Sequence, residues 1–219
     1  MDKEKLNKQK QYWDTIFSNK PGMFGSKPSI AALKAAKIFK EKKISNILEL
    51  GAGQGRDTLF FAKEGFQVQA LDYSQVALNS IIEKANTLGL SKLITTKCYD
   101  IRESLPFDNE TFNGCFSHML YCMAFTNKEL KSLTNEINRV LKFNALNIYT
   151  VRHTKDGDYK AGIHRGENLY ESGGFIVHFF SEEKITQLSN GFEIMNIESF
   201  EEGDFPRKLF RITLKKIKM

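Results

Sequence analysis

The sequence is short of the features that mark secreted or membrane proteins. Its three cysteines, Cys98, Cys115 and Cys122, are an odd number with no CxxC pair and no zinc-type spacing to histidine. No apolar run approaches the ~20 residues that span a bilayer, and the N-terminal MDKEKLNKQK is too polar for a signal peptide. These absences predict a cytoplasmic protein without a membrane partner, in which Cys98 and Cys115 are packed, reduced thiols.

Long runs of one charge are also missing. The net charge is +6, but the lysines are scattered and no five or six basic residues stand together, which does not favour a nucleic-acid partner. The 219 residues, 41% of them hydrophobic, predict a single domain whose core needs no disulfide or metal. The sequence leaves the oligomeric state open between monomer and homodimer.

From residue 44 onward, short apolar runs alternate with helical periods. This alternation predicts an α/β fold, Rossmann-like and doubly wound, with a mainly parallel seven-stranded sheet and an antiparallel terminal hairpin. The predicted strands are ISNILEL (44–50), FQVQALD (66–72), KLITTKC (92–98), FNGCFSHM (112–119), ALNIYTV (145–151), FEIMNIESF (192–200) and KLFRITLKK (208–216).

Capping signals place the helices between these strands. Ser74 is a candidate N-cap, and Thr126 with Glu129 has the T-x-x-E spacing of a capping box. Before the first strand, a helix is expected up to about Ser18 and a second over residues 29–42. Residues 1–42 are therefore interpreted as a helical cap on a single domain that spans residues 1–219.

The stretch ILELGAGQGRDT (47–58) predicts a buried strand, then a glycine-rich turn, then the start of a helix. Its glycines are Gly51, Gly53 and Gly55, and the residue after them is Arg56. The dinucleotide fingerprint G-x-G-x-x-G fails at its last glycine, and no G-K-[ST] follows to make a phosphate-binding P-loop. The turn therefore indicates a ligand other than a phosphorylated nucleotide.

With Glu49 in front, the pattern E-x-G-x-G-x-G resembles motif I of class I S-adenosylmethionine-dependent methyltransferases. The resemblance extends over about residues 44–151 and to 190–216 as the terminal strands. It implies S-adenosyl-L-methionine as cofactor and no metal. In the family an acid at the position of Asp72 holds the ribose, and the residues at Asp100 and Ile101 contact adenine. The implied cofactor contacts are Glu49, Gly51, Gly53, Gly55, Asp72, Tyr73, Asp100 and Ile101.

Two departures from family patterns are informative. A methylase of exocyclic base nitrogens would carry (D/N)PP(Y/F) where this chain has Ser117, His118 and the two residues after them, which argues against a nucleic-acid base as acceptor. The turn into the fifth strand has Phe143-Asn144-Ala145 in place of Pro-Gly-Gly, and Asn144 can adopt the left-handed conformation that such a turn needs.

The N-terminal QYWDTIF resembles the cap of small-molecule methyltransferases, including the tellurite-resistance group. Tyr12 is expected to close over the cofactor sulfonium by cation–π attraction, and Trp13 to anchor the helix to the core. Residues 153–180 show no clear element and are interpreted as a substrate lid inserted at the ligand edge of the sheet. Within this lid, His178 lies in an apolar run and is expected to be packed.

A second set of residues is assigned to the acceptor and to catalysis. His153, His164 and Tyr12 are the catalytic candidates, and substrate binding is assigned to Tyr12, His118, Arg152, His164 and Arg165. The expected activity is in-line methyl transfer to a small molecule, and the basic lid favours an anion, with a thiol, metalloid or carboxylate all open. The alternatives are an RNA or protein methyltransferase and a non-catalytic S-adenosylmethionine-binding module.

Overall fold

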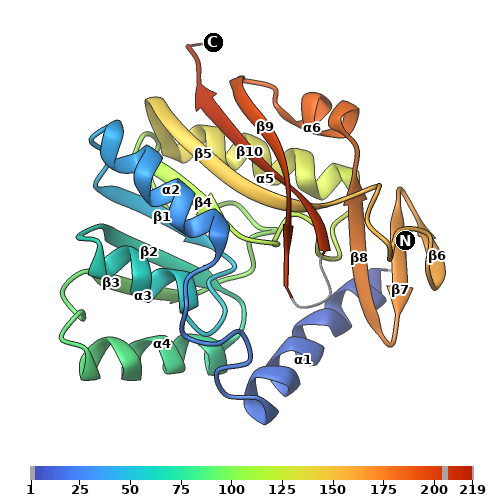
Figure 1. Cartoon of the computed structure of the whole chain (residues 1–219), viewed down its shortest axis with the longest axis horizontal. Coiled ribbons are helices and arrows are strands. Elements are labelled where there is room, and N and C mark those ends of the chain that lie inside the picture. Colours follow the sequence, from blue (N-terminus) through green and yellow to red (C-terminus); the bar gives the residue numbers. More distant parts are fainter. Residues whose placement is uncertain (1–2, 204–206, 219) are drawn as a thin grey trace.

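A computed structural model describes residues 3–203 and 207–218 of the chain (Figure 1). The helices of this part are α1 (Lys3–Asn19), α2 (Ile30–Glu41), α3 (Arg56–Lys63), α4 (Gln75–Thr87), α5 (Asn127–Val140) and α6 (Glu182–Leu188). The strands are β1 (Asn46–Leu50), β2 (Gln67–Asp72), β3 (Ile94–Cys98), β4 (Phe112–Ser117), β5 (Leu141–His153), β6 (Ile163–Gly166), β7 (Leu169–Ser172), β8 (Phe175–Phe180), β9 (Phe192–Glu202) and β10 (Arg207–Lys216).

The predicted seven strands form one continuous sheet in the order β3-β2-β1-β4-β5-β10-β9. The first five pair in parallel, whereas β10 is antiparallel to both β5 and β9. The Rossmann-like prediction is therefore confirmed. The turn between β9 and β10 includes residues 204–206, which lie outside the described part. Strand order reverses at β1, so the carboxyl ends of β1 and β4 form the crevice where ligands bind in such sheets.

The caps that the sequence predicts are present. The side chain of Ser74 accepts a hydrogen bond from the amide of Ala77, and Thr126 and Glu129 form a complete capping box at the start of α5. Asn144 has φ of 62°, the left-handed conformation expected of it. These local signals fix where each helix begins and therefore where the loops at the ligand edge lie.

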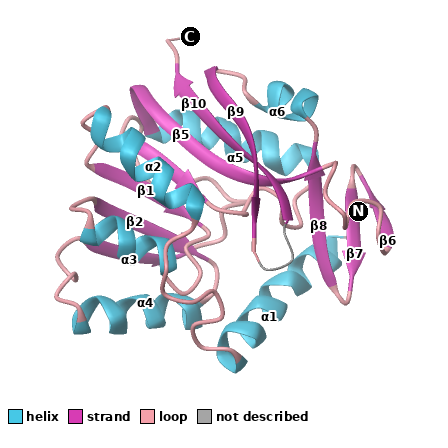
Figure 2. Cartoon of the chain, viewed as in Figure 1, coloured by secondary structure: helices cyan, strands magenta, loops and turns pink. Residues whose placement is uncertain are grey.

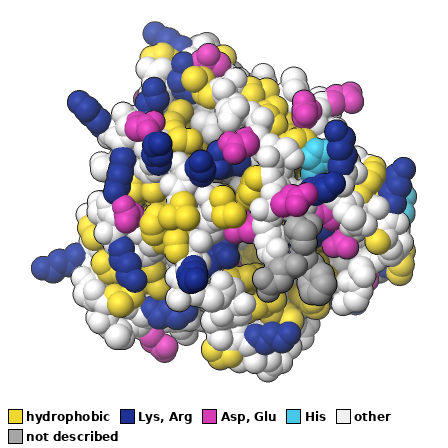
Figure 3. Space-filling model, viewed as in Figure 1, with side chains coloured by type: hydrophobic (Ala, Val, Ile, Leu, Met, Phe, Trp, Pro, Cys, Tyr) yellow, Lys and Arg dark blue, Asp and Glu magenta, His cyan; other side chains and the backbone are white. Residues whose placement is uncertain are grey.

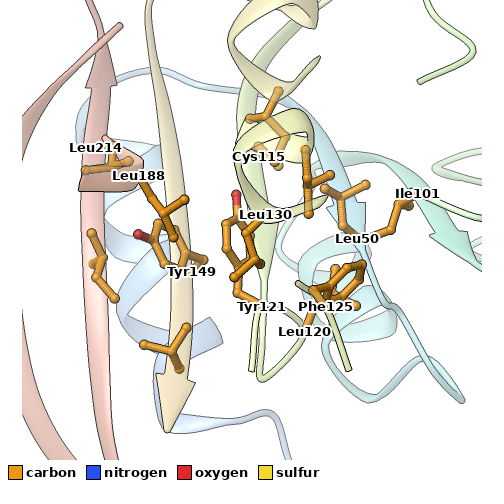
Figure 4. Close-up of a cluster of buried hydrophobic side chains, with 14 of the residues drawn as sticks. Leu50, Ile101, Cys115, Leu120, Tyr121, Phe125, Leu130, Tyr149, Leu188 and Leu214 are labelled. Atoms are coloured by element: carbon orange, nitrogen blue, oxygen red, sulfur yellow. The ribbon is translucent and has the colours of Figure 1, made fainter. Parts of the chain in front are cut away.

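A hydrophobic core lies on each face of the sheet. On one face, α2 and α3 pack through Phe39 and Phe61. On the other, α5 packs over Tyr121 and Tyr149, whose rings stack with centroids 4.2 Å apart (Figure 4). Leu50, Ile101, Leu120 and Phe125 gather at one side of this second cluster. Three of these four residues also line the cavity described below, so the core reaches the site directly.

The segment 153–180 differs from the prediction, because it is not a loop without elements. It forms the antiparallel strands β6, β7 and β8, which extend the sheet beyond β5 (Figure 2). Two of these strands have only four residues, Gly166 ends β6, and Gly173 and Gly174 separate β7 from β8, so the first two runs are too short to show the alternation of a strand. His178 on β8 is fully buried, as expected.

The cysteines follow the prediction only in part. Cys115 and Cys122 are buried, but Cys98 is exposed. Cys98 ends β3, which stands at the open edge of the sheet, so no further strand covers it.

Candidate functional site

In the glycine turn after β1, four backbone amides donate hydrogen bonds to groups of the protein itself. The amides of Gly51 and Ala52 both donate to the carbonyl of Leu71, that of Gly53 donates to Oδ2 of Asp72 over 2.8 Å, and that of Gly55 donates to the carbonyl of Ala52. A phosphate at a helix start needs free N–H groups. The turn therefore does not suit a phosphorylated ligand, as its sequence predicted.

Two of the glycines are needed for different reasons. Gly55 has φ of 84°, and a Cβ there would lie 2.6 Å from Cγ1 of Ile81, so this glycine allows α3 and α4 to pack and lies outside the cavity. Gly53 has φ of 53° and faces the cavity, where a Cβ would meet only the ring of Phe17 at 3.6 Å. A side chain at position 53 would stand between the turn and a ligand.

A cavity lies beyond the carboxyl ends of β1, β2 and β4 and beneath α1. It contains most of the predicted cofactor residues together with His118. Its lining consists of Gln9, Lys10, Trp13, Phe17, Phe24, Gly51, Gly53, Asp72, Tyr73, Tyr99, Asp100, Ile101, Arg102, His118, Met119, Leu120, Met123, Ala124 and Phe125.

Asp72 is the carboxylate at the centre of this wall. Its Oδ2 accepts from Gly53 and its Oδ1 accepts from the amide of Ser74 over 2.9 Å, so the main chain fixes its orientation. Each oxygen retains a further lone pair for a ligand donor. Burial raises the pKa of Asp72 above its ordinary value, although these two backbone hydrogen bonds act to lower it. A ligand with hydroxyl donors would relieve that cost of burial.

Asp100 is held by a residue that the sequence did not single out. The guanidinium of Arg102 grips its carboxylate, with Nη2 2.6 Å from Oδ2 and Nε 3.0 Å from Oδ1. Burial opposes ionisation, but the hydrogen bonds from Arg102 keep the pKa of Asp100 below its ordinary value. A basic residue two positions after the acid is a weak sequence signal, because only the loop conformation brings the two side chains together.

Glu49 does not reach the cavity. It lies beneath the turn, only 3% exposed, and its Oε2 has no hydrogen-bond partner among the described residues. Burial, helped by the nearby charge of Asp57, raises the pKa of Glu49 from 4.5 to about 8. A protonated, enclosed Glu49 supports the turn from behind, whereas the sequence placed it among the residues that touch the ligand.

Helix α1 covers the cavity between α4 and β8 (Figure 1). The expected roles of its two aromatic residues are exchanged: Trp13 lines the cavity, whereas Tyr12 does not and stacks on Phe175 at 5.9 Å between ring centroids. The side-chain amide of Gln9 donates to the carbonyl of Gly174 over 2.9 Å and accepts from the amide of Ile176. The tip between β7 and β8 therefore holds α1 in place.

His118 lies at the end of β4 in the cavity wall. Its Nδ1 is 2.9 Å from Oγ1 of Thr150, and its Nε2 is 3.4 Å from Oε2 of Glu202. Burial lowers the pKa of His118, although the carboxylates of Asp57 and Glu202 act to raise it. Burial therefore favours the neutral imidazole, and both nitrogens are directed at protein groups.

The two arginines assigned to the substrate lie outside the cavity. Arg152 is buried and bound to Asp156 and, over 2.7 Å, to Asp158. Arg165 pairs with Glu171 on the neighbouring strand over 2.6 Å. Each guanidinium is therefore neutralised by a nearby carboxylate and neither lines the cavity, so the structure gives no support to these two residues as a basic lid over the ligand.

The two histidines assigned to catalysis are likewise distant. The ring of His164 is stacked on Tyr170 in the exposed hairpin, with centroids 4.9 Å apart. His153 stacks on Phe210 at 3.9 Å, and its Nδ1 accepts from the amide of Lys155. Neither lines the cavity. The structure thus brings together six of the eight predicted cofactor residues and His118, but none of the candidates between residues 152 and 165.

Two further observations concern the described residues only. They contain no group of three or more His, Cys, Asp or Glu side chains placed to hold a metal ion. None of their helices combines the length and the apolar character that a bilayer crossing requires.

Comparisons with known proteins agree with this geometry. Residues 47–144 match a family profile described as a methyltransferase domain. No curated protein sequence matches the chain. The fold is that of a Methanosarcina mazei S-adenosylmethionine-dependent methyltransferase, with a TM-score of 0.70 and 21% identity over 80% of this chain and 94% of that one.

Two other solved structures are similar over more of this chain. A Burkholderia thailandensis 1,6-didemethyltoxoflavin-N1-methyltransferase, solved with S-adenosylhomocysteine, has a TM-score of 0.75 and 16% identity over 96% of this chain and 88% of that one. TehB from Haemophilus influenzae has a TM-score of 0.68 and 17% identity over 93% of this chain and 67% of that one. The chain therefore carries a methyltransferase domain over residues 47–144, and it has the fold of S-adenosylmethionine-dependent methyltransferases.

Proposed function

We propose that the chain transfers the methyl group of S-adenosylmethionine to a small, largely apolar acceptor bound beneath α1. The observation that carries this proposal is that one cavity has both acidic and apolar walls. We assign the cofactor to the part lined by Asp72 and Asp100, called the polar end, and the acceptor to the part lined by Trp13, Phe24 and Met123, called the apolar end.

The polar end fits the cofactor residue by residue. Asp72 would accept a ribose hydroxyl, Asp100 the adenine amino group, and Tyr73 and Ile101 would flank the adenine ring. Gly51 and Gly53 leave space for the methionine part, whose ammonium carries positive charge. The bound cofactor supplies a methyl group on a sulfonium, which is already activated toward nucleophiles. The protein's own contribution is to hold the acceptor atom in line with that methyl.

The apolar end favours an uncharged acceptor with a flat or aromatic surface. Aromatic and methionine side chains dominate there, and such walls adapt to planar ligands. The arginines that would have favoured an anion are paired elsewhere. The similarity to a toxoflavin-precursor N-methyltransferase supports a heteroaromatic acceptor, while that to TehB keeps tellurite in the set to be tested.

The geometry does not supply a strong base. Both nitrogens of His118 face Thr150 and Glu202, so the imidazole is a wall of the acceptor end and a positioning group for the adjoining loop. Met119 has φ of 62°, a conformation that L side chains rarely adopt, and its amide donates to Thr150 Oγ1 over 2.9 Å. His118 and Thr150 together stabilise that bend, which shapes the acceptor end.

The domain organisation that follows is one domain with a cap and a clasp. The cap is the N-terminal part, of which α1 covers the ligand, and the clasp is β6–β8, whose tip holds α1 through Gln9 and Phe175. The inserted segment would therefore influence the acceptor indirectly, by setting how tightly the cap closes.

The proposal is tested by incubating the protein with methyl-labelled S-adenosylmethionine and a panel of N-heterocycles, phenols, aliphatic thiols and tellurite. We expect label transfer to a planar, uncharged member of the panel. An RNA methyltransferase would instead label RNA and bind it with steep salt dependence. On the face shown in Figure 3, basic side chains are interspersed with acidic ones and form no continuous stripe. Cofactor binding without transfer to any acceptor would favour the non-catalytic alternative.

A further inference from the structure

One buried side chain, that of Gln54, joins the glycine turn to the end of α1. Gln54 directly follows Gly53 and is only 6% exposed. Its Nε2 donates to the carbonyl of Phe17 and to that of Lys20, each over 3.2 Å, and its Oε1 accepts from the amide of Met23 over 3.0 Å. The side-chain amide of Gln54 is therefore directed at the cap.

The sequence explains why the end of α1 needs this partner. The last carbonyls of a helix have no intrahelical donor. The amide that would continue the helical bonding to Phe17 belongs to position 21, which is a proline and has no N–H. Gln54 supplies the donor that Pro21 lacks, so the helix ends on a side chain of the glycine turn.

The residues that follow Gln54 hold the rest of the link between α1 and α2. Asp57 accepts from the amide and from the hydroxyl of Ser29, each over 2.8 Å, at the start of α2. The guanidinium of Arg56 lies over the ring of Phe24 at 5.9 Å. Residues 54–57 therefore fix the connecting segment at both of its ends.

The segment held in this way carries part of the cavity wall. Phe17 and Phe24 both line the cavity. A Cβ at Gly53 would lie 3.6 Å from the ring of Phe17, and Trp13 stacks on that ring with centroids 5.2 Å apart. The contacts of Gln54 therefore set the separation between the turn proposed for the methionine part of the cofactor and the aromatic wall proposed for the acceptor.

We propose that Gln54 is a positioning residue for methyl transfer, which holds the aromatic wall of the cavity at a fixed distance from the glycine turn. This inference rests on the proposed function, in which an acceptor bound against that wall must lie in line with the cofactor methyl. Because the same side chain joins the turn to the cap, a ligand in the turn should also order the end of α1. The coupling is reciprocal, so breaking the link should weaken binding of that ligand.

The test is titration of the full chain with S-adenosylhomocysteine, followed by the emission of Trp13, which is the only tryptophan in the sequence. Gln54→Met removes the donor and the acceptor and keeps a side chain of similar length. The change in Trp13 emission at saturation should shrink, and affinity should fall about tenfold. Gln67→Met is the matched control, because it alters an exposed glutamine at the amino end of β2 and should behave as the wild type.

Thermal denaturation separates positioning from a purely structural role. A purely structural Gln54 would lower the melting temperature of Gln54→Met and leave the Trp13 response of the folded protein unchanged. A second measurement needs no variant: S-adenosylhomocysteine should slow hydrogen exchange at the amides of Lys20 and Met23 in the wild type. Unchanged exchange there, or an equal Trp13 response and affinity in the wild type and Gln54→Met, would overturn the inference. Failure of the wild type to bind S-adenosylhomocysteine at all would instead overturn the placement of the cofactor.

Discussion

The contact between the clasp and the cap can be tested by removing one ring. Phe175 packs against Tyr12 at 5.9 Å and edge-on against Trp13 at 5.5 Å, and among the described residues Gln9 also joins α1 to β8 by accepting from the amide of Ile176. An aromatic pair contributes about 0.5–1.5 kcal/mol beyond its buried area. Phe175→Ala should therefore destabilise the closed cap by about 1–3 kcal/mol and lower the ratio of closed to open forms by roughly 5–150-fold.

Two measurements follow this change. Hydrogen exchange of the α1 amides should accelerate, whereas the amides of β1 and β4 keep their protection, because the loss is local. If binding of S-adenosylhomocysteine requires the closed form, the apparent affinity should fall by the same factor as the population of that form. Phe143→Ala is the control, since Phe143 is 54% exposed on β5. If α1 exchanges at the same rate in Phe175→Ala as in the wild type, the clasp does not hold the cap.

Four other substitutions separate the roles of the remaining residues. Asp72→Asn should weaken S-adenosylhomocysteine binding by at least about tenfold with the fold retained, and undiminished affinity would remove the ribose assignment. His164→Ala and Arg165→Ala should leave turnover unchanged, because their side chains lie outside the cavity, and a large loss would restore the lid as a substrate-binding element. Burial raises the pKa of Glu49 from 4.5 to about 8 in the folded protein. The protonated carboxyl therefore contributes fully to the free energy of unfolding below pH 4.5, and this contribution is lost as the pH rises through 8. Urea unfolding between pH 5 and pH 8.5 should therefore show a smaller loss of stability in Glu49→Gln than in the wild type, and parallel curves would contradict the raised pKa.

The cofactor end could be predicted from the sequence because its features are local. The left-handed conformation of Gly53 and the cap at Ser74 depend on neighbours within a few residues. The acid at position 72 follows from where β2 ends, and parallel strands bring such ends to one edge. Glu49 is the exception, because the same pattern of residues is compatible with a side chain that points to the ligand or beneath the turn.

The acceptor end could not be predicted in the same way, because it depends on contacts between distant residues. Gln9 and Gly174 are 165 positions apart, and nothing near either residue indicates the other. The choice between Tyr12 and Trp13 depended on the rotation of α1, which is set by where Phe175 stands. Arg152 and Arg165 suggested an anionic ligand, but Asp158 and Glu171, which lie within residues 153–180, pair with them and neutralise their charges.

The walls proposed for the cofactor are main-chain turns and acids whose positions follow from the sheet, so they would hold the sulfonium at a fixed place. The walls proposed for the acceptor come from α1 and the loop after β4, and β8 holds both. Phe175 on β8 contacts α1. His178 on β8 contacts the loop, because its amide donates to the carbonyl of Cys122 and its Nδ1 bonds to the carbonyl of Phe125. Substitutions on β8 should therefore change which acceptor is methylated while the affinity for S-adenosylhomocysteine changes only through cap closure. That strand contributes no residue to the cavity lining, yet it connects both movable walls and is where acceptor selectivity would be altered without touching the cofactor site.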